Sequence, residues 1–129
     1  MNPSLTLSIL PDRLAVCRLE PGATLDTTTL TGSLWSVTRT ADEVSLVVPE
    51  ALVQPGWQSE GGWRALKVLG PLDFSLVGIL SLLSGALAEA GISLFALSTY
   101  DTDYILVKEN DRVRAVKALL SAGCSVIDA

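Results

Sequence analysis

From residue 63 onward, strand and helix patterns alternate in the order βαββαβ, which few small folds accommodate. Between Asp73 and Glu89 lie 15 residues without a charge. This stretch is too short to span a membrane, which takes about 20 residues, so we expect a helix buried against a sheet. Gly91 and Gly123 are placed to end the two helices. The predicted elements are strand 64–69, helix 74–90, strands 92–99 and 104–107, a helix between Asp111 and Gly123, and a closing strand 124–127.

This order is typical of an α+β, ferredoxin-like fold, in which an antiparallel four-stranded sheet is covered by helices on one face. The first half of the chain repeats part of it. At an offset of 60, residues 34–38 align with 94–98 and residues 44–47 with 104–107. At an offset of 59, residues 7–10 align with 66–69 and are followed by Pro11. The sequence therefore predicts two related units in tandem.

The N-terminal unit is a degenerate copy, because no long apolar helix follows Pro11 and residues 14–19 form an added strand pattern. The loop 49–62, which contains two prolines and three glycines, is the natural boundary. We therefore expect a degenerate unit over residues 1–60 and a complete unit over residues 61–129. Trp35, which aligns with Phe95, is expected in the core.

Composition narrows the function classes. A chain of 129 residues with 49% hydrophobic residues can fill one ordinary core. It has no histidine, which removes the usual general base and the commonest nitrogen ligand for zinc. Cys17 and Cys124 form no metal-ligand cluster. We expect both side chains to be buried in the protein core, and the protein to be in a reducing compartment. The net charge is −5 and the basic residues are scattered, so nucleic acid is not an expected partner.

These features predict a cytoplasmic protein without catalytic activity, metal or cofactor, and without membrane association. Without histidine, the groups that remain to recognise a charged ligand are backbone N–H groups and carboxylates. The turn 70–74 leads from a strand into a helix N-terminus, where N–H groups and the helix dipole favour an anion. Gly78 has no side chain and permits close approach to that helix.

The run 86–107, which includes the letters LSTYDTDYILV, resembles ACT domains, as do the segments 35–40 and 70–74. The similarity is strongest to small bacterial tandem-ACT proteins related to the CASTOR arginine sensors and to aspartate-kinase regulatory domains. The resemblance implies an allosteric regulatory or sensor protein that binds an amino acid at an interface between ACT units.

The resemblance also implies the contact residues, carried over position by position. They lie in the loop entering the first helix, in that helix, at the start of the next strand and in a Ser-Thr-aromatic run followed by Asp. The implied ligand-binding residues are Asp73, Phe74, Gly78, Ile79, Ser93, Leu94, Thr99, Tyr100 and Asp103. The arginine sensors have an acidic residue where this chain has Leu76, which favours a ligand smaller or more apolar than arginine.

Other interpretations of the same residues stay open. Asp73 also suits a helix N-cap, and Asp103 also suits a tight turn, whereas Asp101 is expected to be a solvated turn residue. Unpaired sheet edges favour a homodimer, in which the sheets pair side by side or pack face to face. The alternative function, from a different class, is a ligand-free structural or protein-interaction module with an ACT fold.

Overall fold

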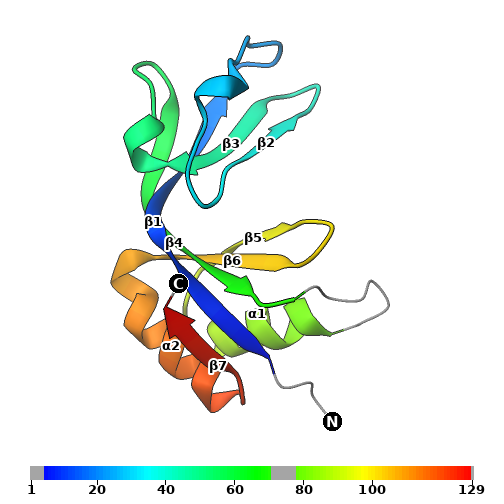
Figure 1. The fold of residues 1–129 in the computed structure, drawn as a ribbon, viewed down its shortest axis with the longest axis vertical. Coiled ribbons are helices and arrows are strands. Elements are labelled where there is room, and N and C mark those ends of the chain that lie inside the picture. Colours follow the sequence, from blue (N-terminus) through cyan, green and yellow to red (C-terminus); the bar gives the residue numbers. More distant parts are fainter. Residues whose placement is uncertain (1–4, 71–77, 129) are drawn as a thin grey trace. The chain divides into compact units, whose positions relative to one another are not determined.

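The computed structural model describes residues 5–70 and 78–128, which form a mixed α+β structure (Figure 1). Its strands are β1 (Thr6–Leu19), β2 (Ser36–Arg39), β3 (Val44–Pro49), β4 (Gln58–Val68), β5 (Phe95–Ser98), β6 (Asp103–Lys108) and β7 (Ser125–Asp128). Its helices are α1 (Ile79–Glu89) and α2 (Arg112–Ser121), with 3-10 turns at Thr27–Thr29, Glu50–Leu52 and Glu109–Asp111. These elements form two compact units. We call Met1–Pro11 with Arg64–Ala129 the helical unit, and Asp12–Trp63 the strand unit.

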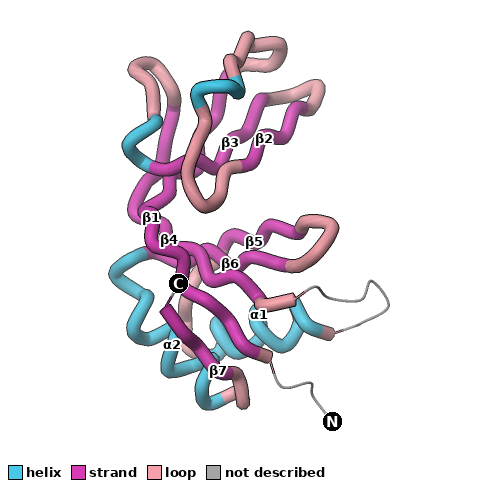
Figure 2. Tube along the Cα trace, viewed as in Figure 1, coloured by secondary structure: helices cyan, strands magenta, loops and turns pink. Residues whose placement is uncertain are grey.

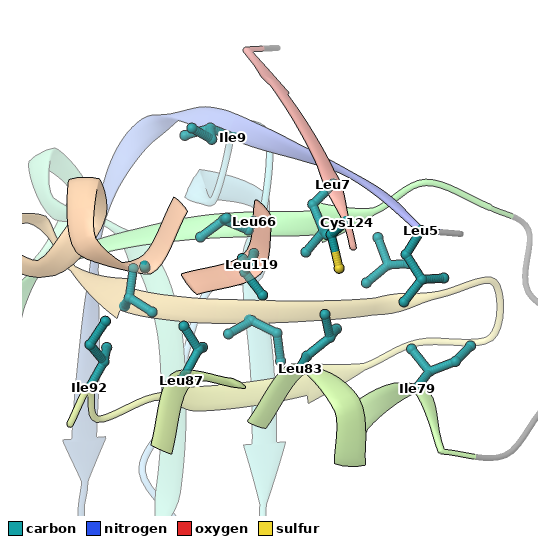
Figure 3. Packing of buried hydrophobic residues seen from close by; sticks show 14 residues of the cluster. Leu5, Leu7, Ile9, Leu66, Ile79, Leu83, Leu87, Ile92, Leu119 and Cys124 are labelled. Carbon is teal, nitrogen blue, oxygen red and sulfur yellow. The ribbon is translucent and has the colours of Figure 1, made fainter. Parts of the chain in front are cut away.

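In the helical unit, the strands follow the order β7-β1-β4-β6-β5, and α1 and α2 cover one face of the sheet (Figure 1). Leu83 and Leu87 lie four residues apart on α1 and are fully buried. They pack with Ile79, Leu119 and core residues of the strands, as Figure 3 shows. The antiparallel hairpin and the two helices are consistent with the predicted ferredoxin-like fold.

The closing strand differs from the simple βαββαβ plan. β7 pairs with β1 in parallel, with Thr6 opposite Ser125, and β1 lies between β7 and β4. The backbone N–H of Leu69 donates to Thr6 O at 2.9 Å at the other edge of β1. The first residues of the chain therefore add a central strand to the unit that the sequence assigned to residues 61–129.

In the strand unit, β3 pairs antiparallel with both β2 and the C-terminal half of β1. Figure 2 shows helical structure in this unit only as short turns, in keeping with the missing apolar helix. A separate core contains Cys17, Leu30 and Leu46, with Trp57 packed against it. The chain passes from one unit to the other at Pro11/Asp12 and again at Trp63/Arg64.

Three local expectations were wrong. A helix was predicted over 74–90, but α1 starts at Ile79, because Gly78 has φ 84°, a left-handed conformation that a right-handed α-helix does not contain; residues 74–77 lie outside the described residues. The strand patterns on either side of Pro11 form one strand; β1 pairs with β7 up to Ile9 and with β3 from Leu14, so proline falls between the two ladders. Trp35 is 39% exposed rather than buried in the core.

Candidate functional site

The tip of the β5–β6 hairpin is held by hydrogen bonds between its first and last loop residues. The Thr99 N–H donates to Thr102 O at 2.8 Å, and the Thr99 hydroxyl also donates to this oxygen, at 3.2 Å. The same hydroxyl accepts from the Thr102 N–H at 3.3 Å. A four-residue loop closed by three hydrogen bonds has a defined shape, although its middle residue Tyr100 is 81% exposed.

Thr102 anchors this tip to the end of β4. Its side chain is 4% exposed, and its hydroxyl donates to the backbone carbonyl oxygen of Val68. The bond joins residues 34 positions apart in the sequence. The hairpin tip is thereby fixed at the end of β4 that leads toward α1.

A second polar pair closes the hairpin at its last strand position. Ser98 lies opposite Asp103 in the register of β5 and β6, and its hydroxyl donates to Asp103 Oδ1 at 2.6 Å. An ionised carboxylate accepts several hydrogen bonds, so Asp103 retains capacity for a further donor after this bond. This half-buried carboxylate can bind an ammonium group.

The start of α1 supplies the complementary type of group. The first intrahelical hydrogen bond runs from the Leu82 N–H to Gly78 O at 2.8 Å, so the N–H groups before Leu82 precede the helical ladder. Gly78 has no side chain to cap them, and the direction in which a Cβ would point is open to 4 Å. The N–H groups at such a helix start can donate hydrogen bonds to the carboxylate of a ligand.

The structure brings together part of the site that the resemblance implied. Figure 1 shows the tip of the β5–β6 hairpin at the same end of the helical unit as the start of α1. By their sequence positions, Thr99 and Tyr100 belong to this tip, Asp103 is the first residue of β6, and Gly78 immediately precedes α1. Ile79 is there as well, but its side chain belongs to the core and only its backbone is available to a ligand (Figure 3).

Two further implied residues, Ser93 and Leu94, do not join this group. Ser93 and Leu94 precede β5 and so lie at its opposite end, whereas the loop begins after Ser98. With about 3.3 Å per strand residue, more than 10 Å of β5 separates the two ends. Leu94 packs against the core of the helical unit. Asp73 and Phe74 lie outside the described residues.

Ser98 and Thr102 are polar residues of this site that sequence reasoning missed. Thr102 follows Thr99 by three residues, a spacing at which a threonine hydroxyl closes a turn on the backbone. That spacing was visible in the sequence. The contact of Thr102 with Val68 was not, because nothing local indicates which carbonyl a distant hydroxyl will reach.

No group of three or more His, Cys, Asp or Glu side chains is arranged to hold a metal ion within residues 5–70 and 78–128. Cys17 and Cys124 are free and buried, and burial raises the pKa of both thiols. None of the described helices is both long enough and apolar enough to cross a membrane.

The chain is similar to known proteins in sequence and in fold. A family model described as ACT domain matches residues 58–121. Protein Atu0741 from Agrobacterium tumefaciens is 30% identical, with a TM-score of 0.91 over 99% of this chain and 96% of that chain. VC0802 from Vibrio cholerae, a protein of unknown function and possible transport protein, is 23% identical, with a TM-score of 0.76 over 93% and 91%. No curated protein matches the sequence.

A third similar structure is the regulatory subunit of aspartate kinase from Thermus thermophilus in its ligand-free form. It has a TM-score of 0.67 at 10% identity and covers 90% of this chain and 95% of that chain. At this identity the likeness concerns the fold alone. The family match begins with the first residue of β4 and ends with the last residue of α2, so it includes the hairpin tip and the start of α1. Residues 58–121 therefore match the ACT domain family, and the chain belongs to one family with Atu0741.

Proposed function

We propose that this protein is a non-catalytic regulatory module that binds an amino acid or a similar small zwitterion. The ligand would lie at the end of the helical unit formed by the hairpin tip and the start of α1. The observation that carries the proposal is the Ser98–Asp103 pair, whose carboxylate is held 2.6 Å from its hydroxyl donor beside an ordered loop. The ACT match and the fold likeness to an aspartate kinase regulatory subunit support a regulatory role.

The proposed site binds the two opposite charges of a zwitterion through two different groups of the protein. Asp103 would bind the ammonium group, and the backbone N–H groups at the start of α1 would bind the carboxylate. Thr99 and Thr102 would hold the loop in the shape that the ligand meets. The free thiols fit a reducing compartment, and the cytoplasmic location stays a prediction.

A comparison of the two hairpins supports the tandem origin that the sequence predicts. The β2–β3 hairpin also has a four-residue loop, in which the Thr40 N–H donates to Glu43 O at 2.9 Å. The Thr40 hydroxyl donates to the same oxygen at 3.3 Å and accepts from the Glu43 N–H at 3.1 Å. This is the pattern of Thr99 and Thr102 at an offset of 59 rather than 60.

The hairpins differ where the ligand is proposed to bind. Arg39 and Val44 occupy the positions of Ser98 and Asp103. The first hairpin therefore shares the loop and lacks the carboxylate. We assign the ligand to the hairpin of the helical unit for this reason.

The test is thermal unfolding of the full chain in the presence of each of the twenty amino acids. A ligand at a hundred times its Kd stabilises the folded chain by about 2.7 kcal/mol. A rise in Tm with one or a few amino acids supports the proposal. A cooperative transition that none of them shifts would contradict it and favour the ligand-free interaction module.

Two variants with the same charge change locate the site. Asp103→Ala should weaken binding of the identified amino acid at least about tenfold, because a charge-assisted hydrogen bond is lost. Asp101→Ala, at an exposed position of the loop that precedes Asp103, is the matched control and should bind as the wild type does. Equal affinities of the two variants would show that the site lies elsewhere.

A further inference from the structure

The face of β5 that points toward the helices is not covered by them. Ala96 lies opposite Ile105 in the β5–β6 register, so both side chains point to the same face of the sheet. Ile105 is 1% exposed and belongs to the core beneath the helices. Ala96 is nevertheless exposed, and so is Ser98, two residues further along the same face. The helices therefore leave open a strip of β5 from Ala96 to Ser98, which we call the β5 strip, and the Asp103 side chain lies on the same face beside it.

One flank of α1 carries an exposed leucine. Leu83 and Leu87 are buried against the strands (Figure 3). Leu82 faces α2, since it lines a groove together with Ala118 of that helix. Leu80 precedes Leu82 by two residues, about 200° around the helix axis, so it points away from α2. Its side chain is 37% exposed.

The flank of α1 that carries Leu80 is the flank toward β5. α2 lies over the other edge of the sheet, because Val116 of α2 and Val126 of β7 line the same groove. β5 is at the opposite end of the strand order from β7. The side of α1 away from α2 is therefore the side of β5. Leu80 and the β5 strip border one region, which begins at the proposed ligand site.

The elements around this region offer no partner to a charged ligand side chain. From Gly78 to Ser98, Glu89 is the only charged residue. Glu89 lines the groove on the α2 side of α1 and lies ten residues from Ile79, about 15 Å along the helix axis. A charged ligand side chain placed on the β5 strip would lose water without gaining a partner. An apolar side chain can contact Leu80 and the methyl group of Ala96.

We propose that the ligand of this protein is an amino acid with an apolar side chain, which lies along the β5 strip over Ala96 and against Leu80. The ammonium group of this ligand binds Asp103, and its carboxylate binds the start of α1. Ala96 then determines specificity, because a larger residue at this position fills the space of the ligand side chain. The inference rests on the proposed function and adds the class of ligand to it.

The experiment is calorimetric titration of the full chain with valine, leucine, methionine and phenylalanine, and with alanine, lysine and glutamate. The tightest of the four large apolar amino acids should bind at least about tenfold more tightly than alanine, because each further buried methylene group contributes about fourfold. Lysine and glutamate should bind at least about tenfold more weakly than that apolar amino acid, because their charges find no partner on the β5 strip.

Variants at Ala96 test where the ligand side chain lies. Ala96→Leu should raise the Kd of the preferred apolar amino acid at least about tenfold, because its side chain occupies the same space. Ala96→Asp should weaken that ligand and shift the preference toward lysine, since it places a carboxylate on the β5 strip. Ala88→Asp adds the same charge at an exposed position of α1 and is the matched control, which should keep the wild-type preference. All variants should keep the wild-type circular dichroism spectrum.

The possible outcomes separate this inference from the proposed function. Preferred binding of lysine, arginine, aspartate or glutamate that Asp103→Ala abolishes would overturn the inference and leave the proposed function intact. An apolar ligand that depends on Asp103 but binds Ala96→Leu as tightly as the wild type would also overturn the inference. Binding of no amino acid would overturn both.

Discussion

The hydroxyl of Thr102 makes a contact whose removal can be measured separately from changes in side-chain volume. In Thr102→Val, the new side chain is similar in size and leaves no cavity, but it cannot donate to Val68 O. Both residues are buried, at 4% and 0% exposure, so water does not readily replace the lost donor. The cost is the hydrogen bond and the desolvation of a carbonyl left with one donor fewer, about 1–3 kcal/mol together.

We therefore expect Thr102→Val to lower the free energy of unfolding by about 2 kcal/mol. For a domain of this size, such a loss lowers Tm by roughly 6–10 °C. Urea denaturation followed by circular dichroism should show a lower midpoint with an unchanged slope, since the surface exposed on unfolding is the same. Thr102→Ser keeps the donor and removes one methyl group, so it should cost about 1 kcal/mol or less.

The control for a general effect of valine is Thr38→Val, at an exposed position of β2, which should change stability by less than about 0.5 kcal/mol. Amide hydrogen exchange should become faster at Thr99 in Thr102→Val, because the loop has lost its anchor. If Thr102→Val is as stable as the wild type within about 0.5 kcal/mol, the bond from the Thr102 hydroxyl to Val68 does not anchor the hairpin tip.

Three further predictions concern single residues. Gly78→Ala should cost about 1–2 kcal/mol in thermal unfolding although no atom obstructs its Cβ, because φ 84° is strained for any residue with a side chain; an unchanged Tm would contradict this origin. Cys17 and Cys124 should react with iodoacetamide only when the chain unfolds, since both are buried and burial raises the pKa of both thiols; rapid labelling of the native chain, read by mass spectrometry, would argue against it. The Thr28 hydroxyl and N–H donate to the Asp26 carboxylate and lower its pKa below the ordinary 3.8. The stability that this carboxylate contributes is therefore present above about pH 4 and is lost as the pH falls through the lower pKa of the folded state. The urea midpoints of Asp26→Asn and the wild type should differ above about pH 4 and converge at lower pH.

Local sequence patterns predicted the helix ends and the β5–β6 hairpin, which depend on neighbouring residues. The ends of both helices follow from Gly91 and Gly123, which adopt φ 73° and 96° where the predicted helices stop. The β5–β6 hairpin follows from two apolar runs around a polar turn. The start of α1 was missed because a glycine within an apolar helical pattern is compatible with both a helix and a break, and only the conformation of Gly78 decides between them.

The features that the sequence did not predict depend on contacts between residues far apart in the chain. Nothing near Ser125 indicates that it pairs with Thr6 at the other end of the chain, so the place of β1 between β7 and β4 was not predictable from periodicity. The candidate site likewise contains residues that a local motif indicates and a contact that only the tertiary fold creates. Thr99 and Asp103 were predicted from a contiguous motif, whereas the bond between Thr102 and Val68 depends on the tertiary fold.

Amide chemical shifts measure directly whether a small zwitterion binds at the end of the helical unit formed by the hairpin tip and the start of α1. In a titration of the ¹⁵N-labelled chain with the amino acid that raises Tm most, the largest shifts should occur at Gly78, Ile79 and residues 98–103. Residues 40–43, which form the same loop without the carboxylate, should shift little. Saturable shifts centred on the first hairpin, or on Ser93 and Leu94 with no change at Asp103, would contradict binding at this site.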